Sequence, residues 1–339
     1  MIFMQNSAKL PLTHVPSALF SVGMGLGGLG AAWLSAARHL GMTALGGHAL
    51  FVLTTGVTVL VMALYALKSI LHRDAVVQEL HDIATANFFP GLTISLMFVA
   101  FWLKSLGLAW STILWQAAAV GHVVLALVIL RSWILRNAEI TRANPSMFVP
   151  IVGLFVVPLT SAGMEVDADP FAWFCFSVAL LFWLALFPVM LNRILFHGQL
   201  PRQFLPTLFI LIAPPALAAS ALAALQGSFG LVAQGFFYAA LFQGLLLATM
   251  ARTFISLPFH LSWWAFTFPS AALASAAMTR HALAPDRFSA PLAALLLTVA
   301  TLISCFVALR TARAFLDGDI WPGPEDIQAE PTPARNEPE

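Results

Sequence analysis

Charged residues are scarce in this sequence, and cysteines are scarcer still. Asp, Glu, Lys and Arg make up 9% of the 339 residues, and the formal net charge is +1. Without a basic excess, the composition gives no case for nucleic acid binding. The two cysteines, Cys175 and Cys305, both lie in apolar stretches. A thiol there acts as a small hydrophobic side chain rather than as a disulfide partner or a metal ligand.

Motifs of catalytic and cofactor sites are also missing. The sequence contains no glycine-rich phosphate loop, no Gly-x-Ser-x-Gly nucleophile elbow and no Cys-x-x-Cys-His haem attachment. The histidine-containing stretch 72–82 lacks the His-Glu-x-x-His spacing that places two imidazoles and a base on one helix face. We therefore expect no enzyme activity, no cofactor and no metal site.

Apolar residues dominate what is present and predict an integral membrane protein. They make up 60% of the chain, and the mean hydropathy is +0.88. About 20 apolar residues in a helix cross a hydrocarbon layer of about 30 Å. The sequence predicts an all-α polytopic fold with ten spans at 15–37, 43–70, 87–104, 108–131, 147–163, 170–193, 203–224, 228–251, 259–280 and 288–312.

The distribution of basic residues predicts an orientation in the membrane. If both termini are cytoplasmic, twelve Lys and Arg residues fall on the inner side, and Arg38, Lys104, Arg280 and Arg287 fall on the outer side. This bias follows the positive-inside rule and favours a location in the inner (plasma) membrane. We expect residues 1–314 to form the transmembrane domain and residues 315–339, which are acidic and proline-rich, to form a disordered cytoplasmic tail.

Five prolines recur on every second apolar segment, each followed by small residues. They are Pro16, Pro90, Pro158, Pro215 and Pro269. This pattern predicts a helical hairpin repeated five times. A proline bends a spanning helix, and lipid offers no partner for the freed backbone group, so such bends are tolerated beside protein or water. We expect the proline-containing segments to line a central pore, and the bulkier alternate segments to face lipid.

Carboxylates are absent from the middle of every predicted span. Carriers coupled to protons or sodium ions commonly hold an acidic group at membrane depth, so we expect weak, fast solute binding instead. The amide groups and positive ends of broken helices suit an anion. Thr93, Thr160, Ser220 and Thr267 would add hydroxyl groups, and Gly23 would allow a tight approach. For each one alone, a bond to its own helix carbonyl, or simple helix packing, is the stronger interpretation.

Phe268 directly precedes the last of the five prolines, where a bend would direct its ring into a channel otherwise lined by Gly, Ala and Ser. A phenyl ring projecting into a pore would close it sterically and by dewetting. The alternative is a core aromatic packed between helices, which position alone favours. Histidines leave a further alternative of another class, an intramembrane enzyme or a b-type cytochrome subunit, which a Soret band would reveal. The histidines concerned are His14, His39, His48 and His122.

Several motifs, taken in order, resemble a known family. They are Phe89-Pro90, Asn144-Pro145-Ser146 ahead of Val149-Pro150, Pro201-Arg-Gln-Phe204 before Ala213-Pro214, and Trp264-Ala265-Phe266-Thr267-Phe268-Pro269. The chain resembles the tellurite-resistance/dicarboxylate transporter family, which includes bacterial TehA, fungal malate and sulfite transporters and plant slow anion channels. The resemblance implies five hairpins around a central pore, a homotrimer with one pore in each subunit, and a phenylalanine gate in the ninth helix that maps onto Phe268.

The resemblance also shapes the functional expectation. It implies channel-like, gradient-driven passage of small anions through the bilayer. The alternative is a coupled carrier or exporter for four-carbon dicarboxylates, sulfite or tellurite-type oxyanions. Some bacterial members have glycine after the gate phenylalanine, whereas this chain has Pro269, so the local bend and the ring orientation are expected to differ.

Overall fold

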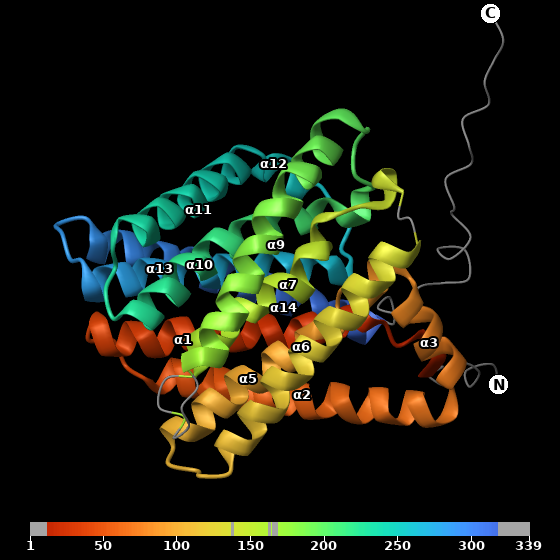
Figure 1. Cartoon of the computed structure of the whole chain (residues 1–339), viewed down its shortest axis with the longest axis horizontal. Coiled ribbons are helices and arrows are strands. Elements are labelled where there is room, and N and C mark those ends of the chain that lie inside the picture. Colours follow the sequence, from red (N-terminus) through yellow and green to blue (C-terminus); the bar gives the residue numbers. More distant parts are fainter. Residues whose placement is uncertain (1–11, 137–138, 162–163, 165–168, 318–339) are drawn as a thin grey trace, which may run out of the picture.

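The computed structural model describes residues 12–136, 139–161, 164 and 169–317. Within these ranges every regular element is a helix and no strand occurs (Figure 1). The long helices form two sets. The inner segments are α1 (Phe20–His39), α5 (Pro90–Ser105), the broken helix Pro145–Thr160, α10 (Ala213–Gln226) and α13 (Thr267–Leu283). The outer helices are α2 (Leu45–Leu71), α6 (Ser111–Arg136), α9 (Asp169–Phe196), α11 (Leu231–Thr249) and α14 (Ser289–Asp317).

Short elements join or precede these helices. The broken helix consists of η4 (Pro145–Phe148), α7 (Val149–Val152), η5 (Gly153–Phe155) and α8 (Val156–Thr160). The other 3-10 helices are η1 (Leu12–His14), η2 (Ser17–Leu19), η3 (Ile140–Arg142), η6 (Arg202–Ile212) and η7 (Leu261–Phe266), and the short α-helices are α3 (Arg73–His81), α4 (Ile83–Ala86) and α12 (Ala251–Ile255).

By length and apolar composition, eight helical stretches in the described part of the chain can cross a membrane. The broken helix is apolar but only 16 residues long, and α13 is not in that set. The prediction of an all-helical, multi-pass membrane protein is therefore confirmed, whereas the prediction of ten spans is not confirmed. The last helix ends at Asp317, three residues beyond the predicted domain boundary at 314.

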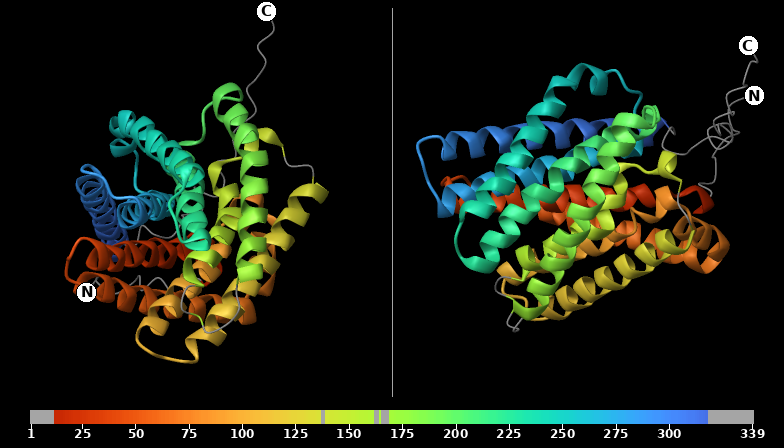
Figure 2. Two further views of the ribbon diagram at one scale, coloured as in Figure 1. Left: turned by 60° about the vertical axis from the view of Figure 1, so that its left-hand side comes forward. Right: turned by 45° about the horizontal axis from the view of Figure 1, so that its top comes forward.

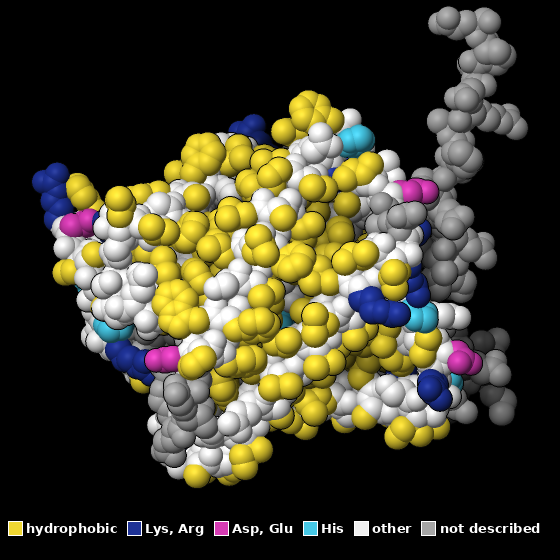
Figure 3. Space-filling view, viewed as in Figure 1, with side chains coloured by type: hydrophobic (Ala, Val, Ile, Leu, Met, Phe, Trp, Pro, Cys, Tyr) yellow, Lys and Arg dark blue, Asp and Glu magenta, His cyan; other side chains and the backbone are white. Residues whose placement is uncertain are grey.

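Burial separates the two sets of helices. In the inner stretches Ser17–His39, Ile83–Ser105 and Arg202–Gln226, 67–78% of the most apolar window is buried, compared with 22–33% for the outer helices. The exposed side of the outer helices is apolar, and a space-filling view shows hydrophobic side chains across the middle of one face with the charged groups near its two ends (Figure 3). Such a surface suits lipid rather than water.

The inner segments pack in a closed ring. In chain order α1 contacts α5, α5 contacts α8, α8 contacts α10, α10 contacts α13, and α13 returns to α1. Each inner segment also packs against the outer helix that follows it in the sequence. The chain consequently travels around the molecule, from α1 in red to α14 in dark blue, which lies beside α1 again (Figure 2).

The five repeated prolines lie at helix starts rather than within long α-helices. Pro16 precedes η2, Pro90 is the first residue of α5, and Pro158, Pro215 and Pro269 are each the third residue of α8, α10 and α13. The first four N–H groups of an α-helix have no partner within the helix, so a proline there removes no ladder bond. Instead of the expected mid-helix bend, α8, α10 and α13 each follow directly on a 3-10 helix.

Candidate functional site

Phe268 lies between two cavities on the axis of the helix ring. It is the second residue of α13, only 5% exposed, and its side chain lines both cavities. One cavity, here called the narrow cavity, has a volume of about 20 Å³. The other, here called the vestibule, has a volume of about 250 Å³. All five inner segments, taken with the 3-10 helices that precede α10 and α13, contribute side chains to each cavity.

The ring of Phe268 is held by α5 and α1. Its centroid lies 6.1 Å from that of Phe98, with the planes at 64°. On the opposite helix, a Cβ added to Gly28 would lie 2.9 Å from Cδ2 of Phe268, closer than real Cβ contacts occur. The missing side chain at Gly28 therefore creates the space that the ring occupies, and aromatic edge-to-face packing fixes its tilt.

The narrow cavity is almost entirely apolar. Ile94, Val152 and Ile210 are among its lining residues, and Pro269 is the one repeated proline in its wall. A volume of this size holds about one water molecule, and a water needs polar partners to stay. Ser21 is the one hydroxyl-bearing residue in the lining. In the conformation described here, this side of Phe268 is therefore poorly suited to a hydrated ion.

The vestibule is wider and more polar. Thr160 and Ser220, two of the predicted site residues, lie in its wall together with Ser275. Arg38 and His39, at the last turn of α1, also line it. Both of these side chains are exposed. The vestibule thus combines hydroxyl groups along its wall with a cationic group at its mouth.

The predicted hydroxyls donate to carbonyls of their own helices. Thr160 donates to Val156 O at 2.7 Å, Ser220 to Ala216 O at 3.2 Å and Thr267 to Trp264 O at 2.7 Å. A hydroxyl whose proton is used in this way presents lone pairs to a solute, so it does not stabilise an anion in this arrangement. The local interpretation, which the sequence favoured for each hydroxyl alone, matches these contacts.

The remaining predicted site residues lie in helix contacts outside both cavities. A Cβ on Gly23 would lie 2.7 Å from Ser95 Oγ and 2.8 Å from Thr58 Oγ1, so Gly23 brings α1 close to α5 and α2. Thr93 packs at the seam with α6. Seven of the predicted site residues line neither the narrow cavity nor the vestibule. They are Gly23, Thr93, Thr267, Pro16, Pro90, Pro158 and Pro215.

His122 joins an outer helix to the ring. Its Nδ1 lies 2.7 Å from Thr93 Oγ1, and its Nε2 lies 3.1 Å from Pro150 O. Thr93 Oγ1 also donates to Pro90 O at 2.8 Å. With a neutral imidazole whose Nε2–H donates to Pro150 O, the single Thr93 hydroxyl proton is therefore shared between the Pro90 carbonyl and Nδ1. In the described residues, no group of three or more His, Cys, Asp or Glu side chains is arranged to hold a metal ion. The side chain of His14 lies outside the described set.

Basic groups gather at the vestibule mouth. Arg280, at the end of α13, is ion-paired with Asp286, and this guanidinium holds the pKa of the Asp286 carboxyl below its usual value. His281 Nδ1 lies 2.8 Å from Ser289 Oγ. Arg280 already occupies the carboxylate of Asp286. Among the described residues, no carboxylate forms an ion pair with Arg38, so the positive charge of the Arg38 guanidinium is not compensated.

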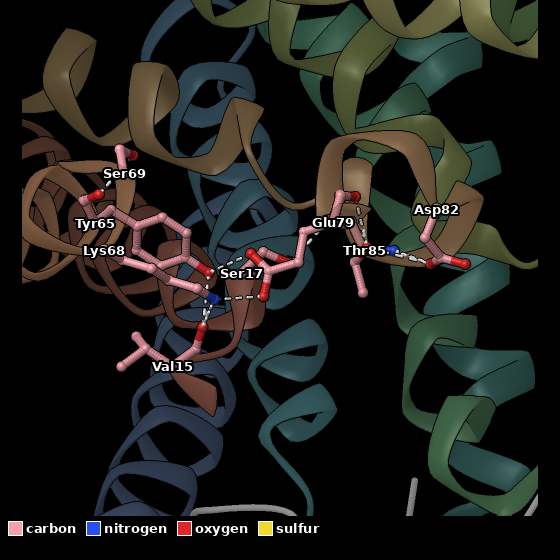
Figure 4. Close-up of polar contacts among 8 residues, drawn as sticks. All are labelled: Val15, Ser17, Tyr65, Lys68, Ser69, Glu79, Asp82 and Thr85. Atoms are coloured by element: carbon pink, nitrogen blue, oxygen red, sulfur yellow. Dashed lines mark hydrogen bonds and ion pairs between the residues drawn. The ribbon is translucent and has the colours of Figure 1, made fainter. Parts of the chain in front are cut away.

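A buried polar cluster stabilises the opposite end of the ring (Figure 4). The Lys68 side chain is fully buried, and its Nζ donates to Glu79 Oε1 and to Val15 O, both at 2.7 Å. The hydroxyl of Tyr65 lies 3.1 Å from the same carbonyl oxygen. These contacts connect the segment that precedes α1 with α2 and α3. In the sequence, Lys68 is only one of the twelve basic residues on the predicted inner side, because no local pattern links a lysine to a glutamate eleven residues later.

A known protein family matches nearly all of the described helices. The SLAC1 family model, described as voltage-dependent anion channel, matches residues 14–312. The chain belongs to this family. Both cavities and all inner segments lie within the matched region. The family assignment agrees with the resemblance to slow anion channels that the sequence motifs indicated.

Relatives in the family include plant and archaeal proteins. S-type anion channel SLAH3 of Arabidopsis thaliana is 28% identical over 336 residues, which cover 95% of this chain and 52% of that protein. Guard cell S-type anion channel SLAC1 of the same plant is 26% identical over 321 residues, covering 91% of this chain and 57% of that protein. The uncharacterized transporter MJ0576 of Methanocaldococcus jannaschii is 23% identical over 231 residues, covering 60% of this chain and 66% of that protein. The chain thus spans about half the length of the plant relatives.

Proposed function

We propose that this protein carries small anions passively across a membrane, along a path through the vestibule, past Phe268 and through the narrow cavity. The observation that carries the proposal is the position of Phe268, the one residue shared by two cavities that all five inner segments line. A phenyl ring at the junction acts as the gate, because it fills the path and repels water.

The sign of the solute follows from the charges near the path. Arg38 and His39 line the vestibule, and no Asp or Glu lines either cavity among the described residues. An arginine at a pore mouth raises the local concentration of anions and lowers that of cations. The names of the plant relatives, which are S-type anion channels, support the same choice.

The proposal includes a topology and an assembly. We infer ten crossings arranged as five hairpins around the pore, with both termini cytoplasmic in the inner (plasma) membrane, as the distribution of Lys and Arg favours. We infer a homotrimer with one pore in each subunit from the family resemblance. The acidic loop at 165–168 and the tail from residue 318 onward lie outside the described residues.

Flux measurements on purified protein in lipid vesicles test the function. We expect chloride, nitrate and other small anions to move down their gradients, with a linear current that scales with the anion gradient and no requirement for a proton gradient. Empty vesicles provide the control. Uptake that appears only with an imposed proton gradient would contradict the passive path and favour a coupled carrier.

A further inference from the structure

A third and larger cavity lies outside the helix ring, between α11, α13 and α14. Its volume is about 440 Å³, within the range of sites that bind small ligands. Leu241 and Ala248 of α11 form one wall, Leu273 of α13 lies at the base, and Val299 and Ile303 of α14 form the other wall. Phe268 is not among its lining residues, so this cavity, here called the lateral groove, is separate from the axial path.

The groove follows from the different sizes of side chains on the inner and outer helices. Both α11 and α14 pack against α13, whose residues are mostly Ala, Ser and Thr. Small residues on α13 leave a shallow base, and the longer side chains of the two outer helices form the rims. Ser270 is the one hydroxyl-bearing residue in the lining, and it donates to Phe266 O at 2.7 Å. An apolar ligand in the groove would therefore leave no hydroxyl group of the lining without a hydrogen-bond partner.

The length of the groove matches one leaflet of a bilayer. From Leu295 to Phe306, both of which line it, α14 advances by about 17 Å at 1.5 Å per residue. Half of a hydrocarbon core of about 30 Å is about 15 Å. Because α14 is one of the helices that can cross the membrane, the groove runs along the direction of the lipid chains.

Two basic side chains, Arg310 and Arg252, lie at one end of the groove. Arg310 lies one turn beyond Phe306 on α14, with its guanidinium carbon 5.7 Å from the ring centroid of Trp263, which lines the groove. Its Nε is buried and has no hydrogen-bond partner. Arg252 of α12 is exposed next to Ala251, another lining residue. A buried donor without an acceptor indicates a missing partner.

Among the described residues of α11 to α14, no carboxylate forms an ion pair with the basic groups at this end. Asp286 precedes α14, at the opposite end of the groove, and is paired with Arg280. Asp317 lies about two turns beyond Arg310 and forms no ion pair with it. The end of the groove is therefore cationic, whereas its length is apolar.

We propose that the lateral groove binds an anionic phospholipid, with one acyl chain along α14 and the phosphate at Arg310. Arginine suits this role because its planar guanidinium donates two parallel hydrogen bonds to phosphate oxygens. Stacking on Trp263 holds the guanidinium in place. A neighbouring copy of the chain would cover the apolar rims. The Nε of Arg310, however, needs an anionic acceptor, which the lipid headgroup supplies.

Native mass spectrometry of the purified full-length protein tests the proposal. The probes are phosphatidylglycerol and phosphatidylcholine with identical acyl chains. Three variants are compared with the unmodified protein: Arg310→Gln, Ala248→Phe, which fills the groove, and Arg131→Gln, which removes an exposed arginine from α6 away from the groove. One phosphate contact near a membrane surface corresponds to about a fivefold preference.

We expect the unmodified protein to retain phosphatidylglycerol about fivefold better than phosphatidylcholine. Arg310→Gln should abolish this preference, Ala248→Phe should lower retention of both lipids, and Arg131→Gln should change neither. An unchanged preference in Arg310→Gln, or an equal loss in Arg131→Gln, would overturn the proposal. So would efficient cross-linking of Ala248→Cys between two copies in native membranes, in a Cys305→Ser background, because the groove would then be a contact between protomers. None of these readouts depends on anion flux.

Discussion

The two cavities that meet at Phe268 differ in size and in chemistry. The narrow cavity, about 20 Å³, is lined almost wholly by apolar side chains, whereas the vestibule, about 250 Å³, has hydroxyl groups and Arg38 in its wall. On the proposed path, an anion entering the vestibule would therefore keep much of its hydration and would meet the main barrier at the ring and just beyond it. The difference teaches that, in the proposed path, the positive charge at the vestibule mouth attracts the anion, whereas the apolar closure at Phe268 and in the narrow cavity limits the rate of passage.

Removing the ring should produce the largest change. Phe268→Ala joins the two cavities, so we expect anion conductance to rise several-fold in reconstituted protein, since the steric plug and its dewetting effect are both lost. Phe266→Ala is the matched control, because Phe266 lies on the same segment but packs against Phe209 and Phe254 instead of lining either axial cavity. Equal conductance in well-folded Phe268→Ala and unmodified protein would refute the gate assignment.

Changing the space next to the ring should have a smaller effect. A methyl group at Gly28 would fill the room on the α1 side, with its Cβ 2.9 Å from Phe268 Cδ2. We expect Gly28→Ala to lower conductance, because the added methyl group presses against the ring and leaves it less room to move. In the Phe268→Ala background the same substitution should have little effect, since the clash no longer exists. Purely additive effects in the double variant would show that Gly28 acts independently of the ring.

Removing the charge at the vestibule mouth should reduce flux moderately. A unit charge about 8 Å from an ion in water-like surroundings changes its local concentration about twofold. We therefore expect Arg38→Gln to lower anion flux about twofold at low ionic strength, and less as salt screens the interaction. Arg287→Gln is the control, because Arg287 lies over the ring of Phe288 and outside the vestibule lining. Salt-independent loss in Arg38→Gln would point to a packing effect.

The smallest effect should come from releasing Arg280. Asp286→Asn breaks the ion pair and adds one uncompensated positive charge near the mouth, so we expect a slight rise in flux.

The Arg280 hydrogen bond lowers the pKa of Asp286 in the folded protein. A lowered carboxyl pKa contributes stability above the unfolded pKa, and this contribution is lost as the pH falls through the folded value. Flux in the unmodified protein should therefore rise only at pH values below the usual Asp range. A rise already complete at neutral pH would exclude this pair.

Much of the helical architecture was accessible from the sequence. Alternation between small-residue and bulky apolar segments predicted which helices would be buried, and the burial of α1, α5 and α10 against α2, α6 and α9 agrees with it. Phe268 was singled out because it is a large ring directly before a repeated proline, ahead of the small residues that follow that proline. These inferences succeed because side-chain size and apolar length are local properties.

Other features depended on contacts that no local pattern encodes. The Lys68–Glu79 pair brings together α2 and α3, and the lateral groove depends on how far apart α11 and α14 pack. The sequence favoured a bond to the own helix for a hydroxyl such as that of Thr160, but it did not predict that Thr160 would make this bond and also lie in the vestibule wall. The position of Pro158, Pro215 and Pro269 just after a 3-10 to α transition depended in turn on where the α-helix begins.

The 3-10 turns in the inner segments change how far a short stretch reaches. A 3-10 helix rises about 2.0 Å per residue, compared with about 1.5 Å in an α-helix. In the broken helix Pro145–Thr160, seven residues are 3-10 and nine are α-helical, so its axial length comes to about 28 Å. A stretch of 16 residues therefore approaches the thickness of the hydrocarbon layer, about 30 Å. Stretching the backbone lets a segment that looks too short by residue number extend nearly from one interface to the other.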